Sequence, residues 1–271
     1  MRIDKRVGII GAGHIGDAMI SGLLRSRILI PDKIQASDNN REICVKIAEA
    51  HGISCQTDNR KLVEESGVVI VAVKPKDIVA VLKGIKDVTT PDHLVISVAA
   101  GVKIGYIEKR LGGKVQVVRV MPNIPVVVGV GMTVLSAGVN VTEENLKVAR
   151  VIFSSVGRVA VVEEKNLDAV TGLSGGGPAY ICLVIEALCD AGVKVGLPRD
   201  VAMTLAAQTT LGSAKMVLES GRDPAELREM VATPGGVTVE GVKALEAGGL
   251  RAAFREAVLR ATARSKELAM E

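Results

Sequence analysis

The sequence contains no tryptophan and only four aromatic side chains in 271 residues, Tyr106, Phe153, Tyr180 and Phe254. Stacking on bases, a common way of holding single-stranded nucleic acid, therefore has almost no residues to use. The 34 basic and 30 acidic residues are interspersed, and neither sign forms a run of five. The net charge of +4 thus predicts no nucleic-acid or membrane-binding patch.

Histidine and cysteine are also scarce. The three histidines pair with no cysteine cluster, so we expect no metal site. Cys44, Cys55, Cys182 and Cys189 form no C-x-x-C pair, which favours free buried thiols in a reducing cytoplasm. Uninterrupted apolar runs stay shorter than about 18 residues. The chain also opens directly on a strand pattern, so we expect no membrane span and a cytoplasmic location.

Apolar residues are patterned differently in the two halves of the chain. Up to about residue 163, short apolar strands alternate with helices. The strands are expected at 7–10, 33–36, 67–73, 93–98, 115–120, 126–135 and 158–162, and helices at 17–24, 42–51, 60–66 and 143–153. The run 67–73 is continuously apolar, as is typical of a parallel strand buried on both faces. Residues 1–163 are therefore predicted to form a doubly wound, Rossmann-like α/β domain with seven or eight strands.

The second half shows no strand pattern. Helices are expected at 179–193, 198–219, 223–231, 239–247 and 250–269. These helices carry more apolar surface than a small bundle can bury, and large exposed patches usually mark interfaces. Residues 164–271 are therefore predicted to form an all-helical dimerisation domain that is covered by a second copy of the chain.

A glycine-rich loop joins the first strand to the first helix. Gly11, Gly13 and Gly16 form the pattern G-x-G-x-x-G directly after strand 7–10. In this position Gly11 permits the tight turn, Gly13 lets a pyrophosphate approach the backbone, and Gly16 lets the helix pack closely on the strand. The loop predicts a dinucleotide cofactor, whereas His14 inside it is expected to face solvent.

The end of the second strand gives conflicting signals about which dinucleotide is bound. Asp38 lies about 20 residues after the glycine loop, where a carboxylate accepts from the free ribose 2′-hydroxyl of NAD. Ser37, Asn40 and Arg41 instead offer donors to the 2′-phosphate of NADP. From these residues alone, either cofactor remains open.

Two later strands end in residues suited to the other end of a dinucleotide. Lys74 and Pro75 follow the central strand 67–73, and the small residues Ala99, Ala100 and Gly101 follow the next strand. The carboxyl ends of such strands form the ligand crevice of α/β sheets. Lys74 is equally well explained as a crevice residue that binds ligand or as an ordinary solvent-facing lysine. The small residues leave room for a nicotinamide ring or its ribose.

Two glycine-rich stretches precede helices in the second half. Residues 170–178 contain four glycines before Pro178, which predicts a flexible hinge that opens a helix. Residues 233–238 repeat this arrangement, with Thr238 expected at the N-cap. Free helix N–H groups suit an anion. The first stretch is read as a linker slightly more readily than as a ligand site, and the second favours a substrate carboxylate near Thr238.

The sequence also resembles the pyrroline-5-carboxylate reductases. The matching segments are 170–180 (VTGLSGGGPAY), 185–188 (IEAL), 190–193 (DAGV), 196–199 (GLPR), 208–209 (QT), 214–216 (AKM) and 233–238 (TPGGVT), together with the glycine loop and 72–75 (AVKP). The resemblance extends over essentially the whole chain. Two positions depart from the family pattern, because Gly176 replaces a frequent serine and His14 a frequent Asn or Lys.

The resemblance implies a Rossmann domain with an interlocked helical dimer, often a pentamer of dimers, that reduces 1-pyrroline-5-carboxylate to L-proline with NADPH, NAD being an alternative. The implied cofactor residues are Gly11, Ala12, Gly13, His14, Ile15, Gly16, Ser37, Asn40, Arg41, Asn59, Ala72, Val73, Lys74, Pro75, Ala99, Ala100 and Gly101. The implied substrate residues are Ser174, Gly175, Gly176, Gly177, Pro234, Gly235, Gly236, Val237 and Thr238.

No histidine or acidic residue lies in a motif that must act as a general acid. We therefore expect the Thr238 hydroxyl to bond the ring nitrogen, with the proton coming from solvent or from a protonated imine. Two other readings remain: another NAD(P)H-dependent imine or hydroxy-acid oxidoreductase, and a dinucleotide-binding regulator without catalysis. The second is disfavoured because a sensor needs only the first glycine loop.

Overall fold

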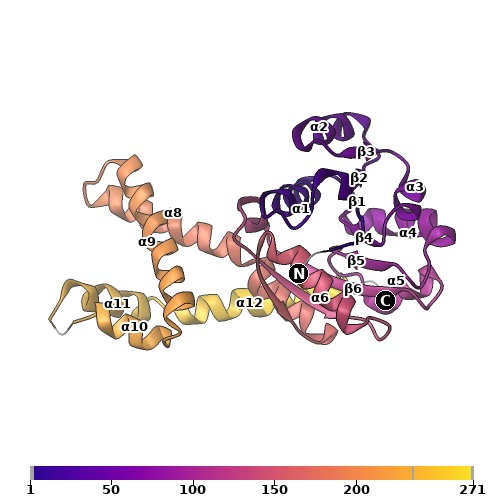
Figure 1. Cartoon of the computed structure of the whole chain (residues 1–271). Helices are drawn as coiled ribbons and strands as arrows, with labels where there is room; N and C mark the ends of the chain where they lie inside the picture. Colours follow the sequence, from indigo (N-terminus) through magenta and orange to yellow (C-terminus); the bar gives the residue numbers. More distant parts are fainter. Residues whose placement is uncertain (1–2, 234, 270–271) are drawn as a thin grey trace. The chain divides into compact units, whose positions relative to one another are not determined.

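The computed structural model describes residues 3–233 and 235–269, and contacts divide the chain into two compact units (Figure 1). The first unit comprises Met1–Gly175 and Ala261–Glu271, and the second comprises Gly176–Arg260. The division falls later in the chain than the boundary expected from the sequence, and the end of the last helix belongs to the first unit.

The first unit is built on an eight-stranded sheet with the order β3-β2-β1-β4-β5-β6-β7-β8. Its strands are β1 (Val7–Ile10), β2 (Ile34–Ser37), β3 (Ser54–Gln56), β4 (Val68–Val71), β5 (Leu94–Ser97), β6 (Gln116–Pro122), β7 (Gly131–Ala137) and β8 (Gly157–Val161). Neighbours pair in parallel except β6 and β7, which are antiparallel. The strand order reverses at β1, so the ligand crevice of this fold is expected beside its carboxyl end.

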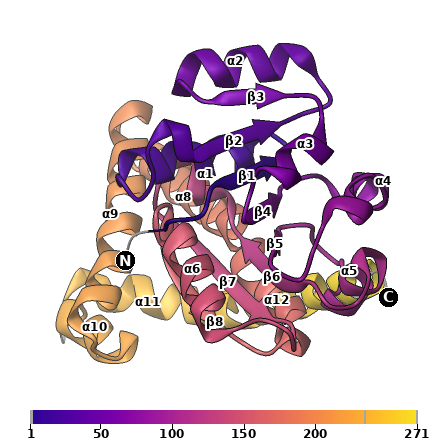
Figure 2. The same ribbon diagram turned by 45° about the vertical axis from the view of Figure 1, so that its right-hand side comes forward.

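Helices pack on both faces of the sheet, as Figure 2 shows from a second side. One buried cluster joins α1 (His14–Arg25), α2 (Arg41–His51) and α6 (Glu143–Ser154) to alternate strand residues such as Ile9 and Ile70. The other joins α3 (Asn59–Glu64), α4 (Ile78–Ile85) and α5 (Ile104–Leu111) to the intervening residues, such as Val69 and Val71. The predicted doubly wound α/β sheet is thus confirmed.

The prediction of a strand over residues 126–135 is wrong in its first part. Residues Ile124–Val128 form a 3-10 turn, and β7 begins only at Gly131. The turn ends at Gly129, whose φ of 76° is readily adopted by glycine alone. The error arose because the apolar residues run on from the turn into the strand, and an apolar run does not distinguish the two.

The stretch 170–178 does separate the two units and opens a helix with Pro178 in its first turn, but its predicted flexible glycine backbone is not observed. After α7 (Leu167–Val170), residues Thr171–Gly175 form one π-helical turn, called the π-turn below, which leads into α8 (Gly177–Lys194). The four glycines are not among the residues with positive φ. By length and composition the helical stretch Glu164–Lys194 could cross a membrane, and only 11% of its most apolar window is buried in the single chain; one such stretch is weak evidence for a membrane span.

The second unit is entirely helical within the described residues. It contains α8, α9 (Arg199–Ser220), α10 (Pro224–Val231), α11 (Val237–Ala247) and most of α12 (Leu250–Glu267). Its buried apolar side chains are Cys189, Ala202, Ala206 and Leu227, whereas residues such as Leu183, Leu205 and Leu211 are more than half exposed. A unit with so small a core does not hide its apolar surface alone, which favours burial against another chain.

Candidate cofactor- and substrate-binding sites

The glycine loop has the geometry of a dinucleotide cradle. Gly11 has φ +96°, and a Cβ there would lie 2.7 Å from the Ala72 carbonyl oxygen. A Cβ at Gly16 would lie 2.1 Å from the Gly11 oxygen, so only glycine fits. Nothing lies within 4 Å of a Cβ built on Gly13, which leaves its backbone open. Gly13 is also the N-cap of α1 and provides no side-chain cap, so the first-turn N–H groups are available to an anion.

The half-buried carboxylate of Asp38 supports this loop. One carboxylate oxygen accepts from the Ala12 N–H at 2.9 Å, and the other accepts from the Asn40 N–H at 3.0 Å. The carboxylate therefore ties the glycine loop to the start of α2, which accounts for an acidic residue here without a ribose hydroxyl. Because these two hydrogen bonds already explain Asp38, its presence does not indicate NAD rather than NADP.

The remaining residues expected at the adenosine end lie around β2. The Ser37 hydroxyl donates to the Asn59 side-chain oxygen at 2.7 Å, and the Asn40 side chain accepts from the Glu42 N–H and caps α2. Arg41 is the exposed first residue of that helix. The structure therefore brings Ser37, Asn40, Arg41 and Asn59 to one edge of the sheet, with an exposed cation among them.

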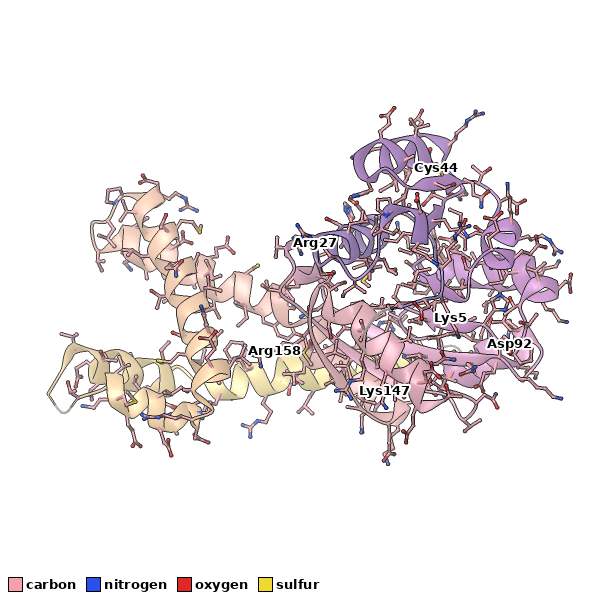
Figure 3. All side chains as sticks on the ribbon, viewed as in Figure 1. Lys5, Arg27, Cys44, Asp92, Lys147 and Arg158 are labelled. Atoms are coloured by element: carbon pink, nitrogen blue, oxygen red, sulfur yellow. The ribbon has the colours of Figure 1, made fainter. Side chains whose placement is uncertain are left out.

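One buried and one half-buried thiol, Cys44 and Cys55, lie beneath the same edge. Cys44 on α2, labelled in Figure 3, donates to the Gln56 carbonyl at 3.3 Å and to the Asp38 carbonyl at 3.5 Å. Burial, then the neighbouring Cys44, raises the pKa of Cys55 to about 12. All four cysteines are free, with Cys189 buried but Cys182 exposed in the single chain. The predicted free thiols are confirmed, whereas burial of all four is not.

The strand ends expected at the nicotinamide end also meet. The Ala72 N–H donates to the Ile10 carbonyl at 2.7 Å, and the Val98 N–H donates to the Val71 carbonyl at 3.1 Å. Residues 72–75 and 99–101 thus follow β4 and β5 beside the carboxyl end of β1. Gly101 has φ +75°, and a Cβ there would lie 3.0 Å from the Leu268 carbonyl oxygen. All the sequence-predicted cofactor residues therefore belong to the first unit and to one edge of its sheet.

The carboxylate of Glu164, which sequence reasoning missed, joins the start of α5 to β6. Glu164 accepts from the Ile104 N–H at 2.7 Å and from the Arg119 guanidinium at 3.2 Å. Arg119 is buried on β6, so the ion pair is largely removed from solvent. No motif marks either residue, although an arginine inside the apolar strand 115–120 is the one signal that could have indicated a buried partner.

Glu108 on α5 gives a prediction about stability. One of its oxygens is buried with no hydrogen-bond partner in the described part of the chain, and burial, then the Glu164 charge, raises its pKa above the ordinary 4.5. Between the ordinary pKa and the raised one, the folded protein keeps a proton on Glu108 that the unfolded chain has released. The contribution of Glu108 to the free energy of unfolding is therefore fully present at acidic pH and is lost as the pH rises through the raised pKa. Glu108→Gln should raise Tm by a few degrees near pH 7 and change it little near pH 4. Equal shifts at both pH values in thermal melts would contradict this.

The residues expected to bind substrate fall into two groups, each described within its own unit. Ser174 and Gly175 lie in the π-turn of the first unit. The Asn123 side chain, which sequence reasoning also missed, donates to the Ser174 carbonyl at 3.2 Å and to its hydroxyl oxygen at 3.4 Å. Gly176 and Gly177 open α8 in the second unit.

The second group lies at the start of α11. Gly236 is the N-cap, Val237 begins the helix, and Gly235 before them has φ +75°. The expectation that Thr238 occupies the N-cap is wrong, because it is the second helical residue. Glycine provides no side-chain cap here, and the N–H groups of a first turn suit a carboxylate. Pro234 lies outside the described residues.

Comparisons with known proteins cover both units. Residues 164–268 match the family model described as pyrroline-5-carboxylate reductase dimerisation, and residues 6–101 match the model described as NADP oxidoreductase, coenzyme F420-dependent. A pyrroline-5-carboxylate reductase from Methanosarcina acetivorans is 47% identical over 98% of both chains.

Two solved structures extend the comparison to the fold. A pyrroline-5-carboxylate reductase from Coxiella burnetii is 36% identical, with a TM-score of 0.95 over 99% of this chain and 100% of that one. The Plasmodium falciparum pyrroline carboxylate reductase, solved with NADP bound, is 31% identical, with a TM-score of 0.88 over the full length of both chains. The similarity therefore includes the glycine loop, the π-turn and the start of α11 together.

Proposed function

The chain belongs to the pyrroline-5-carboxylate reductase family, and from that premise we propose that it reduces 1-pyrroline-5-carboxylate to L-proline with NADPH. This reaction is the last step of proline biosynthesis. The observation that supports the proposal is the 47% identity over 98% of both chains.

The residues present fit a dinucleotide phosphate. The open backbone at Gly13 and the uncapped start of α1 suit the pyrophosphate. Arg41 and the polar side chains around Ser37 suit the 2′-phosphate, and residues 72–75 and 99–101 suit the nicotinamide end. When bound, NADPH supplies the hydride that the imine carbon needs.

The substrate is a small cyclic imine with a carboxylate. We assign the carboxylate to the π-turn residues Ser174 and Gly175, to Gly176 and Gly177, and to the N–H groups at the start of α11, Gly235–Thr238. The Thr238 hydroxyl hydrogen-bonds the ring nitrogen and orients the imine. It donates to the lone pair of a neutral imine, with solvent providing the proton, or it accepts from the N–H of a protonated imine. Pro234 completes this set as a prediction from the sequence.

The second unit supports a homodimer. Its matched family model is a dimerisation domain, and its apolar side chains are largely exposed in the single chain. We propose that a second copy, rather than a membrane or nucleic acid, covers them in a cytoplasmic enzyme. The pentamer of dimers that the family resemblance implies can be tested by light scattering of the purified protein.

Arg41→Ala tests the assignment of the 2′-phosphate. Removing one exposed cation from a phosphate contact should lower the preference for NADPH over NADH by about tenfold, or about 1.4 kcal/mol. The measurement is kcat/KM with each cofactor. Lys46→Ala, which removes an exposed cation from the same helix, should leave the ratio unchanged. An unaltered ratio in the Arg41 variant would assign the discrimination elsewhere.

The decisive assay for the function follows NADPH absorbance with and without 1-pyrroline-5-carboxylate and identifies the product. Substrate-dependent oxidation with formation of L-proline is expected. Oxidation only with other imines or hydroxy acids would instead identify a related oxidoreductase. Tight NADPH binding with no turnover of any of these compounds would identify a dinucleotide-binding regulator.

A further inference from the structure

Residues on one face of β6, and Asn123 just after it, contact the segment 164–175 that contains Ser174. Side chains alternate along a strand, so residues 119, 121 and 123 share a face, and Asn123 continues the extended backbone with φ −113° and ψ 163°. Arg119 pairs with Glu164 at 3.2 Å. A Cβ on Gly175 would lie 2.8 Å from the Met121 methyl carbon, and Asn123 bonds Ser174. The strand therefore fixes the π-turn at its carboxyl end.

The Asn123 carboxamide is fixed in orientation by partners whose roles are not interchangeable. Its oxygen accepts from the Met132 backbone N–H at 2.8 Å, and its nitrogen donates to the Ser174 backbone carbonyl at 3.2 Å. A backbone N–H only donates and a carbonyl only accepts, so a flipped amide would lose both bonds. The nitrogen consequently also faces the Ser174 hydroxyl oxygen, at 3.4 Å.

This orientation determines what the Ser174 hydroxyl can do. A hydroxyl has one hydrogen and two acceptor lone pairs, and the donation from Asn123 occupies a lone pair. The hydrogen then remains for an acceptor outside this pair. Asn123 thus holds the π-turn through the Ser174 carbonyl and leaves the Ser174 hydroxyl free to donate. π-Helical turns are frequent at functional sites.

We propose that Asn123 is a positioning residue for substrate binding, which acts through Ser174 by holding its hydroxyl ready to donate to the substrate carboxylate. The inference rests on the proposed function, since it takes the substrate carboxylate as the acceptor. It adds a residue outside the glycine-rich segments, and it assigns a role to the side-chain hydroxyl of Ser174 separate from that of its backbone.

The test is Asn123→Asp, with the KM for each substrate as the readout. The aspartate keeps an acceptor for the Met132 N–H, but it removes the donor and places a carboxylate beside the Ser174 hydroxyl, which would then donate to the aspartate. The KM for 1-pyrroline-5-carboxylate should rise about tenfold or more, while the KM for NADPH stays unchanged. Asn145→Asp is the matched control: it changes another buried, hydrogen-bonded asparagine, on α6, and should leave both constants unchanged.

A double-mutant cycle with Ser174→Ala shows whether Asn123 acts through the serine. The double variant should have nearly the KM of Ser174→Ala alone, because the hydroxyl that Asn123 directs is already gone. Additive effects on KM would overturn the proposal, as would a wild-type KM in Asn123→Asp. If that variant does not fold, Asn123→Ala enters the same cycle, and failure of both to fold would establish a structural role and reject the proposal.

The proposed function can fail separately from this inference. A wild-type protein that does not oxidise NADPH with 1-pyrroline-5-carboxylate would refute the function itself. An active wild type together with an unaltered Asn123→Asp variant would refute only the role of Asn123.

Discussion

A Gly13→Ala variant is expected to fold as the wild type does and to bind NADPH about 10- to 100-fold more weakly, or about 1–3 kcal/mol. The backbone at Gly13, with φ −72° and ψ −164°, is accessible to alanine, and nothing in the free chain lies within 4 Å of the new Cβ. The methyl group would instead occupy the space through which the pyrophosphate approaches the backbone.

Thermal melts and NADPH titration of the Gly13 variant test this directly. Gly84→Ala is the matched control, because its Cβ also meets nothing within 4 Å and it lies on α4. That variant should bind NADPH normally and gain up to about 1 kcal/mol in stability, since alanine is the better helix former. Wild-type affinity for NADPH in Gly13→Ala would show that the pyrophosphate does not approach the loop at this residue.

The second large effect is expected at Thr238. Thr238→Ala should reduce kcat by about 100-fold, or about 2.7 kcal/mol, if its hydroxyl stabilises the developing charge on the ring nitrogen as other positioned donors do. The Kd of NADPH should not change, because the residues proposed to bind the cofactor all belong to the first unit and do not include Thr238, which lies on α11.

Two variants make the Thr238 result interpretable. Thr238→Ser retains the hydroxyl and should recover most of the turnover. Thr210→Ala removes a hydroxyl from α9 that donates only to the Ala206 carbonyl of its own helix, and it should leave kcat unchanged. A Thr238→Ala enzyme with wild-type kcat would remove this hydroxyl from the mechanism.

The parts of the fold that could be predicted are those with a local signal. The apolar run 67–73 contains β4, and G-x-G-x-x-G identified the first turn because its glycines have steric reasons visible in the sequence alone. The helices α4 and α5, by contrast, were not predicted, and the strand that begins after Gly129 was placed too early. At Gly129 apolar residues continue across the element boundary, so periodicity gives no boundary to detect there.

The candidate site could be predicted where it depends on backbone conformation, but not where it depends on side-chain contacts between residues far apart in the sequence. Gly11, Gly13 and Gly16 were identified from their spacing. At 170–178 the division between the units was placed correctly, but the glycine backbone was not. Glycine permits but does not require positive φ, and contacts with β6 hold a π-turn here instead. Glu164 and Asn123 were missed because each contacts residues more than 40 positions away, and no single-sequence pattern marks such pairs.

The central claim is that this chain transfers a hydride from NADPH to the imine carbon of 1-pyrroline-5-carboxylate, and labelled cofactor tests it most directly. NADPH carrying deuterium at both hydrogens of the nicotinamide C4 is incubated with the enzyme and the imine, and the product is analysed by mass spectrometry and NMR. The account predicts L-proline with one deuterium at the former imine carbon. Proline without deuterium, or consumption of the cofactor that does not depend on the imine, would contradict it.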